Sequence, residues 1–125
     1  MSLGRVLVVD DEPEVRQVLQ EFLSDRGYDV IQAEDGLAAL AALAAHKPDL
    51  VLLDVAMPEM DGVETLKRIV ALEMPVPVIM VTANADIAVT SKLLALGAVD
   101  YIPKPFDLDY LDQAVSIQVA ATQDR

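Results

Sequence analysis

The sequence predicts an α/β fold in which a parallel sheet carries helices on both faces. Short apolar runs alternate with stretches of helical periodicity along all 125 residues. Several of these runs contain almost no polar side chain, as expected for strands that are covered on both faces. The strand-then-helix order occurs five times, which requires right-handed crossovers and therefore indicates a doubly wound five-stranded parallel sheet.

The apolar runs are expected to form the strands. They are "RVLVV" at 5–9, "DVIQA" at 29–33, "DLVLL" at 49–53, "VPVIMV" at 76–81 and "VDYI" at 99–102. The first, third and fourth are almost wholly apolar, which is typical of strands buried inside a parallel sheet.

The stretches between these runs have the spacing of amphipathic helices. In the first, one apolar stripe holds Val15, Val18, Leu19, Phe22 and Leu23, and Gly27 provides a C-terminal cap. The second runs from 36 to 46 and repeats Leu37, Leu40 and Leu43 over alanines that allow close packing. Three more are expected at 61–72, 86–96 and 108–121.

Length and composition limit the classes of protein to consider. We expect one domain over 1–125 with an ordered core at about 5–121, and we assign no function to Met1 to Gly4. There is no cysteine, no signal-like start and no apolar run near the roughly 20 residues of a membrane span, so we expect a soluble cytoplasmic protein. A net charge of −12 argues against direct binding to nucleic acid.

Polar residues follow four of the predicted strands. They are Asp10 and Asp11, then Asp54, then Thr82, and finally Lys104. Because the carboxyl ends of parallel strands meet at one edge of the sheet, these side chains are expected to share a site.

Carboxylates that crowd together repel each other. Two of them about 4 Å apart cost about 4 kcal/mol at an effective dielectric constant of about 20. A hard divalent cation, Mg²⁺ or Mn²⁺, together with Lys104 would offset this repulsion. Because a carboxylate can act as a nucleophile, Asp54 becomes a candidate for an aspartyl phosphate.

Four motifs then carry a family resemblance over essentially the whole chain. They are "VVDDE", "LLDVAMPEMDG", "VTA" and "YIPKPF". The chain resembles the receiver domain of bacterial two-component response regulators. This resemblance implies a flavodoxin-like (βα)5 fold with strand order 2-1-3-4-5, and a signalling switch rather than a metabolic enzyme.

The resemblance also implies a role for each matching residue. Asp54 would take a phosphoryl group from a histidine kinase, a phosphotransfer protein or a small acyl phosphate. The implied metal ligands are Asp11 directly, Asp10 mainly through water, Asp54, and the main-chain carbonyl of Ala56. Lys104, aimed by a cis bond to Pro105, would pair with phosphoryl oxygens. Thr82 would move to hydrogen-bond the phosphate, Tyr101 would rotate inward, and the surface of the fourth helix, fifth strand and fifth helix would change.

Two positions vary within the family pattern and are expected to tune the phosphoryl lifetime. Ala56 is two residues after Asp54, where many relatives carry a polar or larger side chain that positions or blocks water. Asn84 is two residues after Thr82 and would flank the same entrance.

The residues at the predicted site argue against three rival functions. A haloacid-dehalogenase-like phosphatase would need a second acid at position 56, where this chain has alanine. A flavin- or nucleotide-binding module would need an anion cradle after the first strand, where "DDEPE" stands instead. A pseudo-receiver that only makes protein contacts would not need the acidic set.

Other polar residues have simpler interpretations. Asp11 alone could be a helix cap, Glu12 a first-turn acid, Asp61 with Gly62 a turn and cap, and His46 a solvated residue at a helix end.

The sequence identifies neither the kinase nor the output domain or target, and it leaves open a weak or phosphorylation-dependent dimer. Residues 107–123 contain no lysine or arginine, so a dimer that pairs charges through the fifth helix is not expected.

Overall fold

A computed structural model describes residues 2–57, 60–72, 76–83 and 86–123 of the chain. The strands are β1 (Arg5–Val9), β2 (Asp29–Ala33), β3 (Leu50–Asp54), β4 (Val78–Thr82) and β5 (Asp100–Pro103). The helices are α1 (Pro13–Asp25), α2 (Gly36–His46), α3 (Gly62–Ala71), α4 (Ile87–Ala95) and α5 (Leu108–Gln123). Every strand and helix expected from the sequence is present, with ends that differ by at most two residues.

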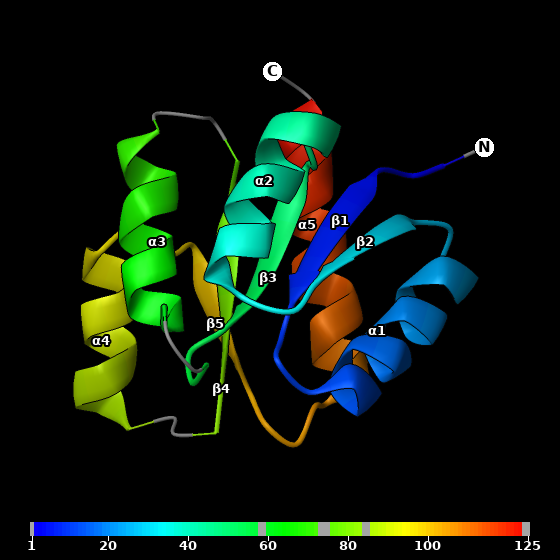
Figure 1. Cartoon of the computed structure of the whole chain (residues 1–125). Helices are drawn as coiled ribbons and strands as arrows, with labels where there is room; N and C mark the ends of the chain where they lie inside the picture. The colour runs from blue at the N-terminus through cyan, green and yellow to red at the C-terminus, as the bar shows by residue number, and fades with distance from the viewer. Residues whose placement is uncertain (1, 58–59, 73–75, 84–85, 124–125) are drawn as a thin grey trace.

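The strands form one parallel sheet in the order β2-β1-β3-β4-β5, which confirms the predicted fold class and strand order. The chain leaves β1 toward β2 on one side and returns to β3 on the other, so the order reverses between β1 and β3. Both termini lie at the top of Figure 1, and the carboxyl ends of the strands lie at the bottom. Ligands of open α/β sheets bind outside these carboxyl ends.

Alternate side chains of the strands build two cores, one on each face of the sheet. On one face, Val8, Leu52 and Ile79 pack with residues of α1 and α5. On the other, Leu53 and Met80 pack with residues of α2, α3 and α4. Figure 1 shows the sheet between these two helical layers. The sheet is therefore held on both faces, as its apolar strands predict.

Helix ends follow the expected chemistry. The backbone N–H of Glu64 donates to Asp61 Oδ1 at 2.8 Å, and that of Ala88 donates to Asp86 Oδ1 at 2.8 Å. Gly27 after α1 and Gly97 after α4 have positive φ angles of 98° and 120°. The cap at the start of α1 is Glu12, which makes no side-chain capping bond, so the alternative of Asp11 as a cap is wrong.

Two predicted core positions are wrong. Val18 is 50% exposed because Leu19 and Leu23 form the row of α1 that faces the sheet. Leu37 is 60% exposed because α2 packs through Gly36, Ala39 and Leu43, so that Leu43 of the leucine repeat is buried and Leu37 is not. Alanines lie on both the buried and the exposed sides of α2, so residue size alone does not identify the face that packs.

Within the described residues, no helix is both long and apolar enough to cross a membrane.

Candidate functional site

Side chains from three strand ends and one loop meet at the carboxyl edge of the sheet. Asp10 follows β1 and is 2% exposed, while Asp54 ends β3 and is 4% exposed. Thr82 ends β4 and is buried as well. Lys104 follows β5, and its bond to Pro105 is cis, as expected. The sheet topology thus brings together residues from four separate parts of the sequence.

The ammonium group of Lys104 lies between the two buried carboxylates. Its Nζ is 3.1 Å from Asp10 Oδ2 and 3.4 Å from Asp54 Oδ1. Glu12 Oε1 lies farther away, at 4.0 Å, and belongs to an exposed side chain. Lys104 therefore neutralises part of the charge that burial would otherwise make costly.

Burial raises the pKa of the Asp54 carboxyl, and the neighbouring Asp10 carboxylate raises it further. Lys104 and the backbone N–H of Ala56, which donates to Asp54, act in the opposite direction without cancelling this rise. Burial lowers the pKa of Lys104, but its contacts with Asp10 and Asp54 outweigh burial and leave that pKa above its usual value. The site therefore favours the charged form of Lys104 and the protonated, neutral form of Asp54.

The loop after β1 carries a compact acidic cluster. Asp10, Asp11 and Glu12 each place one carboxylate oxygen within 4.8 Å of the other two. This all-oxygen donor set fits Mg²⁺, which prefers carboxylates and water. Asp10 is buried, whereas Asp11 and Glu12 are exposed, so an ion here would be open to solvent on one side.

Glu12, interpreted from sequence as a first-turn acid, is the N-cap residue of α1 and also lies beside the site. Glu12 belongs to the acidic cluster, approaches Lys104 and lines the cavity described next. Its distance from Lys104 depends on the loop after β5, so the sequence alone gave no signal for this contact.

A cavity of about 440 Å³ opens above the buried carboxylates. It is lined by Glu12, Asp54, Val55, Ala56, Thr82, Ala83, Val89 and Lys104. Ala56 and Thr82 thus face the same space as Asp54, as the sequence predicts. Asn84, the other position expected to tune the phosphoryl lifetime, lies outside the described residues.

The start of α3 approaches the backbone of Asp54 closely. The N–H of Gly62 donates to the carbonyl of Val55 at 2.9 Å. A Cβ atom at position 62 would lie 2.7 Å from the Cα of Val55 and closer still to the carbonyl oxygen of Asp54. Gly62, interpreted from sequence as ordinary turn chemistry, is therefore required by the packing of α3 against the end of β3.

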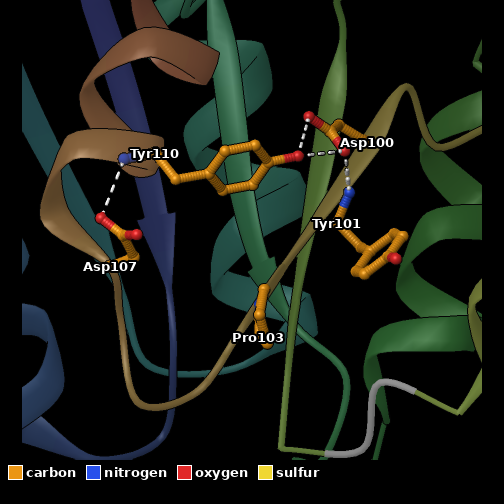
Figure 2. A pocket seen from close by; sticks show the side chains of 5 residues that line it. All are labelled: Asp100, Tyr101, Pro103, Asp107 and Tyr110. Carbon is orange, nitrogen blue, oxygen red and sulfur yellow. Dashed lines mark hydrogen bonds between the residues drawn. The ribbon is translucent and has the colours of Figure 1, made fainter.

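Tyr101 lies on β5 and does not line the cavity at Asp54. Its ring is half-buried and packs at the edge of the core beneath α2, α3 and α4. Its backbone N–H donates to Asp100 Oδ1 at 2.8 Å. The hydroxyl of Tyr110 donates to the same carboxylate, at 2.9 and 3.0 Å from its two oxygens, as Figure 2 shows.

A second cavity, of about 560 Å³, lies where β5 meets α5. Figure 2 shows its lining: Asp100, Tyr101, Pro103, Asp107 and Tyr110. Burial and the Asp100 carboxylate raise the pKa of Tyr110, which therefore stays protonated as a donor. This cavity is larger than the one at Asp54, but the carboxylate–ammonium chemistry belongs to the latter.

His46 is exposed in the last turn of α2, at the opposite end of the strands from the site, where its carbonyl accepts from Arg5 Nη1 at 2.6 Å. It belongs to no site described above, as the sequence predicts.

Comparisons with known proteins agree with this geometry. The family model described as "Response regulator receiver domain" matches residues 6–116. Regulatory protein AtoC of Escherichia coli (strain K12) is 42% identical over 114 residues, which are 91% of this chain but 25% of AtoC. Sporulation initiation phosphotransferase F of Bacillus subtilis (strain 168) is 40% identical over 115 residues, which are 92% of this chain and 93% of that protein. The chain thus spans a quarter of one relative and nearly all of the other.

Among solved structures, the receiver domain of the Francisella response regulator 1452 superposes with a TM-score of 0.91. It shares 31% sequence identity, and the match covers 95% of this chain and 98% of that one.

Proposed function

Because the chain belongs to the response regulator receiver domain family, we propose that Asp54 is its phosphoacceptor and that Mg²⁺ supports the phosphoryl transfer. The observation that carries this proposal is the position of Lys104 Nζ, within 3.4 Å of both Asp54 and Asp10 at the carboxyl edge of the sheet. The family acts as a signalling switch of two-component systems, so the reaction serves to change the state of the domain.

In the proposed reaction, a carboxylate oxygen of Asp54 attacks phosphorus, and the bond between phosphorus and the donor breaks. The donor is a phosphohistidine of a kinase or phosphotransfer protein, or a small acyl phosphate. Lys104 balances charge on the phosphoryl oxygens, and the Thr82 hydroxyl donates to one of them. Asp10, Asp11, Asp54 and the carbonyl of Ala56 would hold Mg²⁺, which supplies further charge neutralisation when bound.

The change of state is proposed to travel from Thr82 to Tyr101 and then to the surface of α4, β5 and α5. The proximity of Thr82 to the cavity and the half-buried ring of Tyr101 support this path. A partner or output domain would read this surface, and a dimer that forms only on phosphorylation would use it as well.

The phosphoacceptor assignment is tested with a small acyl phosphate and Mg²⁺. We expect the wild type to gain one phosphoryl group by intact-mass spectrometry, and Asp54→Asn to gain none. Asp61→Asn is the matched control, because Asp61 is an exposed carboxylate that caps α3. Equal labelling of wild type and Asp54→Asn would place the phosphoacceptor elsewhere.

A pseudo-receiver is separated from this proposal by binding of Mg²⁺ with beryllofluoride, a phosphate mimic. A receiver binds the pair stoichiometrically, whereas a domain that only makes protein contacts binds none.

Ala56 and Asn84 are proposed to set the phosphoryl lifetime. Ala56 is exposed and lines the cavity above Asp54, where its methyl group neither orients nor blocks water. Ala56→Asn is therefore expected to change the rate of autodephosphorylation, measured as loss of the phosphoryl group over time. Ala41→Asn, an exposed position of α2, is the control. An unchanged rate in Ala56→Asn would exclude the tuning role of this position.

A further inference from the structure

Arg16, in the first turns of α1, reaches back to the acidic loop after β1. Its Nη1 donates to the main-chain carbonyl of Asp10 at 2.6 Å, and its Nε donates to Gln32 Oε1 at 3.1 Å. Gln32, on β2, donates in turn to Gln20 Oε1 of α1 at 3.2 Å. The half-buried guanidinium thus joins α1, β2 and the acidic loop through side-chain hydrogen bonds.

Each polar group of Asp10 has a partner from a different place in the chain. Its N–H donates to the carbonyl of Ala33 at 3.2 Å. Its Oδ1 accepts from the N–H of Glu12 at 2.9 Å, and its Oδ2 from Lys104 at 3.1 Å. Its carbonyl accepts from Arg16. Lys104 binds the side chain of Asp10, whereas Arg16 is the charged partner that binds its main chain. The carbonyl that Arg16 contacts belongs to the peptide that joins Asp10 to Asp11.

We propose that Arg16 is a positioning residue for the metal site. By holding the Asp10–Asp11 peptide, it fixes the direction in which both carboxylates leave the loop and so keeps them close enough to share one ion. Charge-assisted hydrogen bonds are the stronger ones, and groups that orient metal ligands commonly affect metal affinity. This inference rests on the proposed Mg²⁺ site.

Arg16 has two effects of opposite sign on a bound dication. Its positive charge repels the ion, whereas its bond to the loop keeps the ligands in place. The guanidinium is partly exposed, so water and salt weaken the repulsion. The bond to Asp10 acts on a residue that is 2% exposed, where solvent competes poorly. Positioning therefore outweighs repulsion. The test is whether loss of the Arg16 side chain weakens or strengthens Mg²⁺ binding.

The experiment is a Mg²⁺ titration of the full chain, followed through the backbone amide NMR signals of residues 10–12. Arg16→Ala is expected to weaken Mg²⁺ affinity by about tenfold, the lower end for ligand-orienting groups. Arg16→Lys, which keeps a cationic donor for the carbonyl, is expected to recover part of this loss.

Arg26→Ala is the matched control. It removes the same charge from the other end of α1, where Arg26 pairs with Asp112 at 3.6 Å, and it is expected to leave Mg²⁺ affinity unchanged. A purely electrostatic role for Arg16 predicts tighter binding in Arg16→Ala, and a purely structural role predicts unchanged binding, with or without a lower melting temperature. Either result overturns the positioning role.

If Arg16→Ala does not fold, Gln32→Ala provides the test, because it removes the anchor of the guanidinium and leaves the charge. A few-fold loss of affinity, smaller than that caused by losing the carbonyl bond, supports the proposal. Unchanged affinity overturns it. Absence of Mg²⁺ binding in the wild type would overturn the proposed metal site together with this role, whereas wild-type binding with unaffected variants would overturn the positioning role alone.

Discussion

At the scale of single residues, Asp54 is a buried carboxyl whose negative charge is only partly balanced by its surroundings. Its carboxyl is almost fully buried, and Asp10 adds a second negative charge on the far side of Lys104. Lys104 is one cation shared by two carboxylates, so it cannot neutralise both. Burial first and the Asp10 carboxylate second raise the pKa of Asp54, so ionised Asp54 reduces the stability of the fold in the absence of a metal.

We expect Asp54→Asn to be more stable than the wild type at pH 7 without Mg²⁺, by about 1 kcal/mol, a common size for a single substitution. A carboxyl with a raised folded-state pKa stabilises fully below its unfolded pKa and loses this contribution as pH rises through its folded pKa. The difference in the free energy of unfolding between Asp54→Asn and the wild type should therefore be small near pH 4 and grow toward pH 8. Urea unfolding in EDTA across this range measures it.

Asp61→Asn, which alters an exposed cap, serves as the control. Asparagine caps helices about as well as aspartate, so the stability of this variant should stay close to that of the wild type across the pH range. If Asp54→Asn were no more stable than the wild type, or more stable by the same amount at every pH, the electrostatic account of Asp54 would be contradicted.

At the scale of helices and strands, local signals predicted most of the structure. The apolar runs predicted the strands, and Gly27 and Asp61 predicted the ends of two helices. The orientation of α2 was less predictable, because a helix rich in alanine and leucine has no distinct polar face. Which of its rows meets the sheet is decided by tertiary packing.

Gly62 connects α3 to the phosphoacceptor candidate. Gly62→Ala is expected to destabilise the fold by about 1–3 kcal/mol, because the new methyl group meets the backbone of Asp54 and Val55, which cannot move aside as a flexible side chain would. The same clash should displace Asp54 and slow its phosphorylation by a small acyl phosphate, measured under conditions in which the variant is folded.

Gly27→Ala separates these two effects. Gly27 follows α1 with a φ angle of 98°, so alanine there is strained as well, but its contacts are to the Leu3 side chain and not to the site. We expect Gly27→Ala to lose about 1 kcal/mol of stability and to keep the wild-type phosphorylation rate. A Gly62→Ala variant with wild-type stability and rate would show that α3 can shift without disturbing Asp54.

At the scale of the whole molecule, the site is a consequence of topology. Asp10, Asp54, Thr82 and Lys104 could be predicted to converge because each ends or follows a strand and all parallel strands end at the same edge. The contacts of Arg16 and Glu12 could not, since they depend on how α1 and the loop after β5 pack against the sheet. The order of strands and helices determines which residues lie at the strand ends. The contacts that a loop makes depend on its three-dimensional packing, which the sequence pattern does not show.

The overall charge of −12 makes any cation mildly stabilising, so specific Mg²⁺ binding must be distinguished from screening. Asp11 offers a clean way to do so. It is exposed, and within the part of the chain that the structure describes its side chain has no hydrogen bond or ion pair. Asp11→Asn should therefore change the stability of the metal-free protein by no more than about 0.5 kcal/mol.

In the wild type, Mg²⁺ at ten times its dissociation constant should add about 1.4 kcal/mol to the free energy of unfolding. Asp11→Asn should lose most of this gain at the same Mg²⁺ concentration, since it removes the ligand that the resemblance places in direct contact with the ion. Thermal or urea unfolding in MgCl₂ and in NaCl of equal ionic strength separates the two effects, because screening acts on both proteins alike. Equal Mg²⁺ stabilisation of wild type and Asp11→Asn would mean that the ion binds elsewhere on this acidic surface, and that the cluster after β1 is not the metal site.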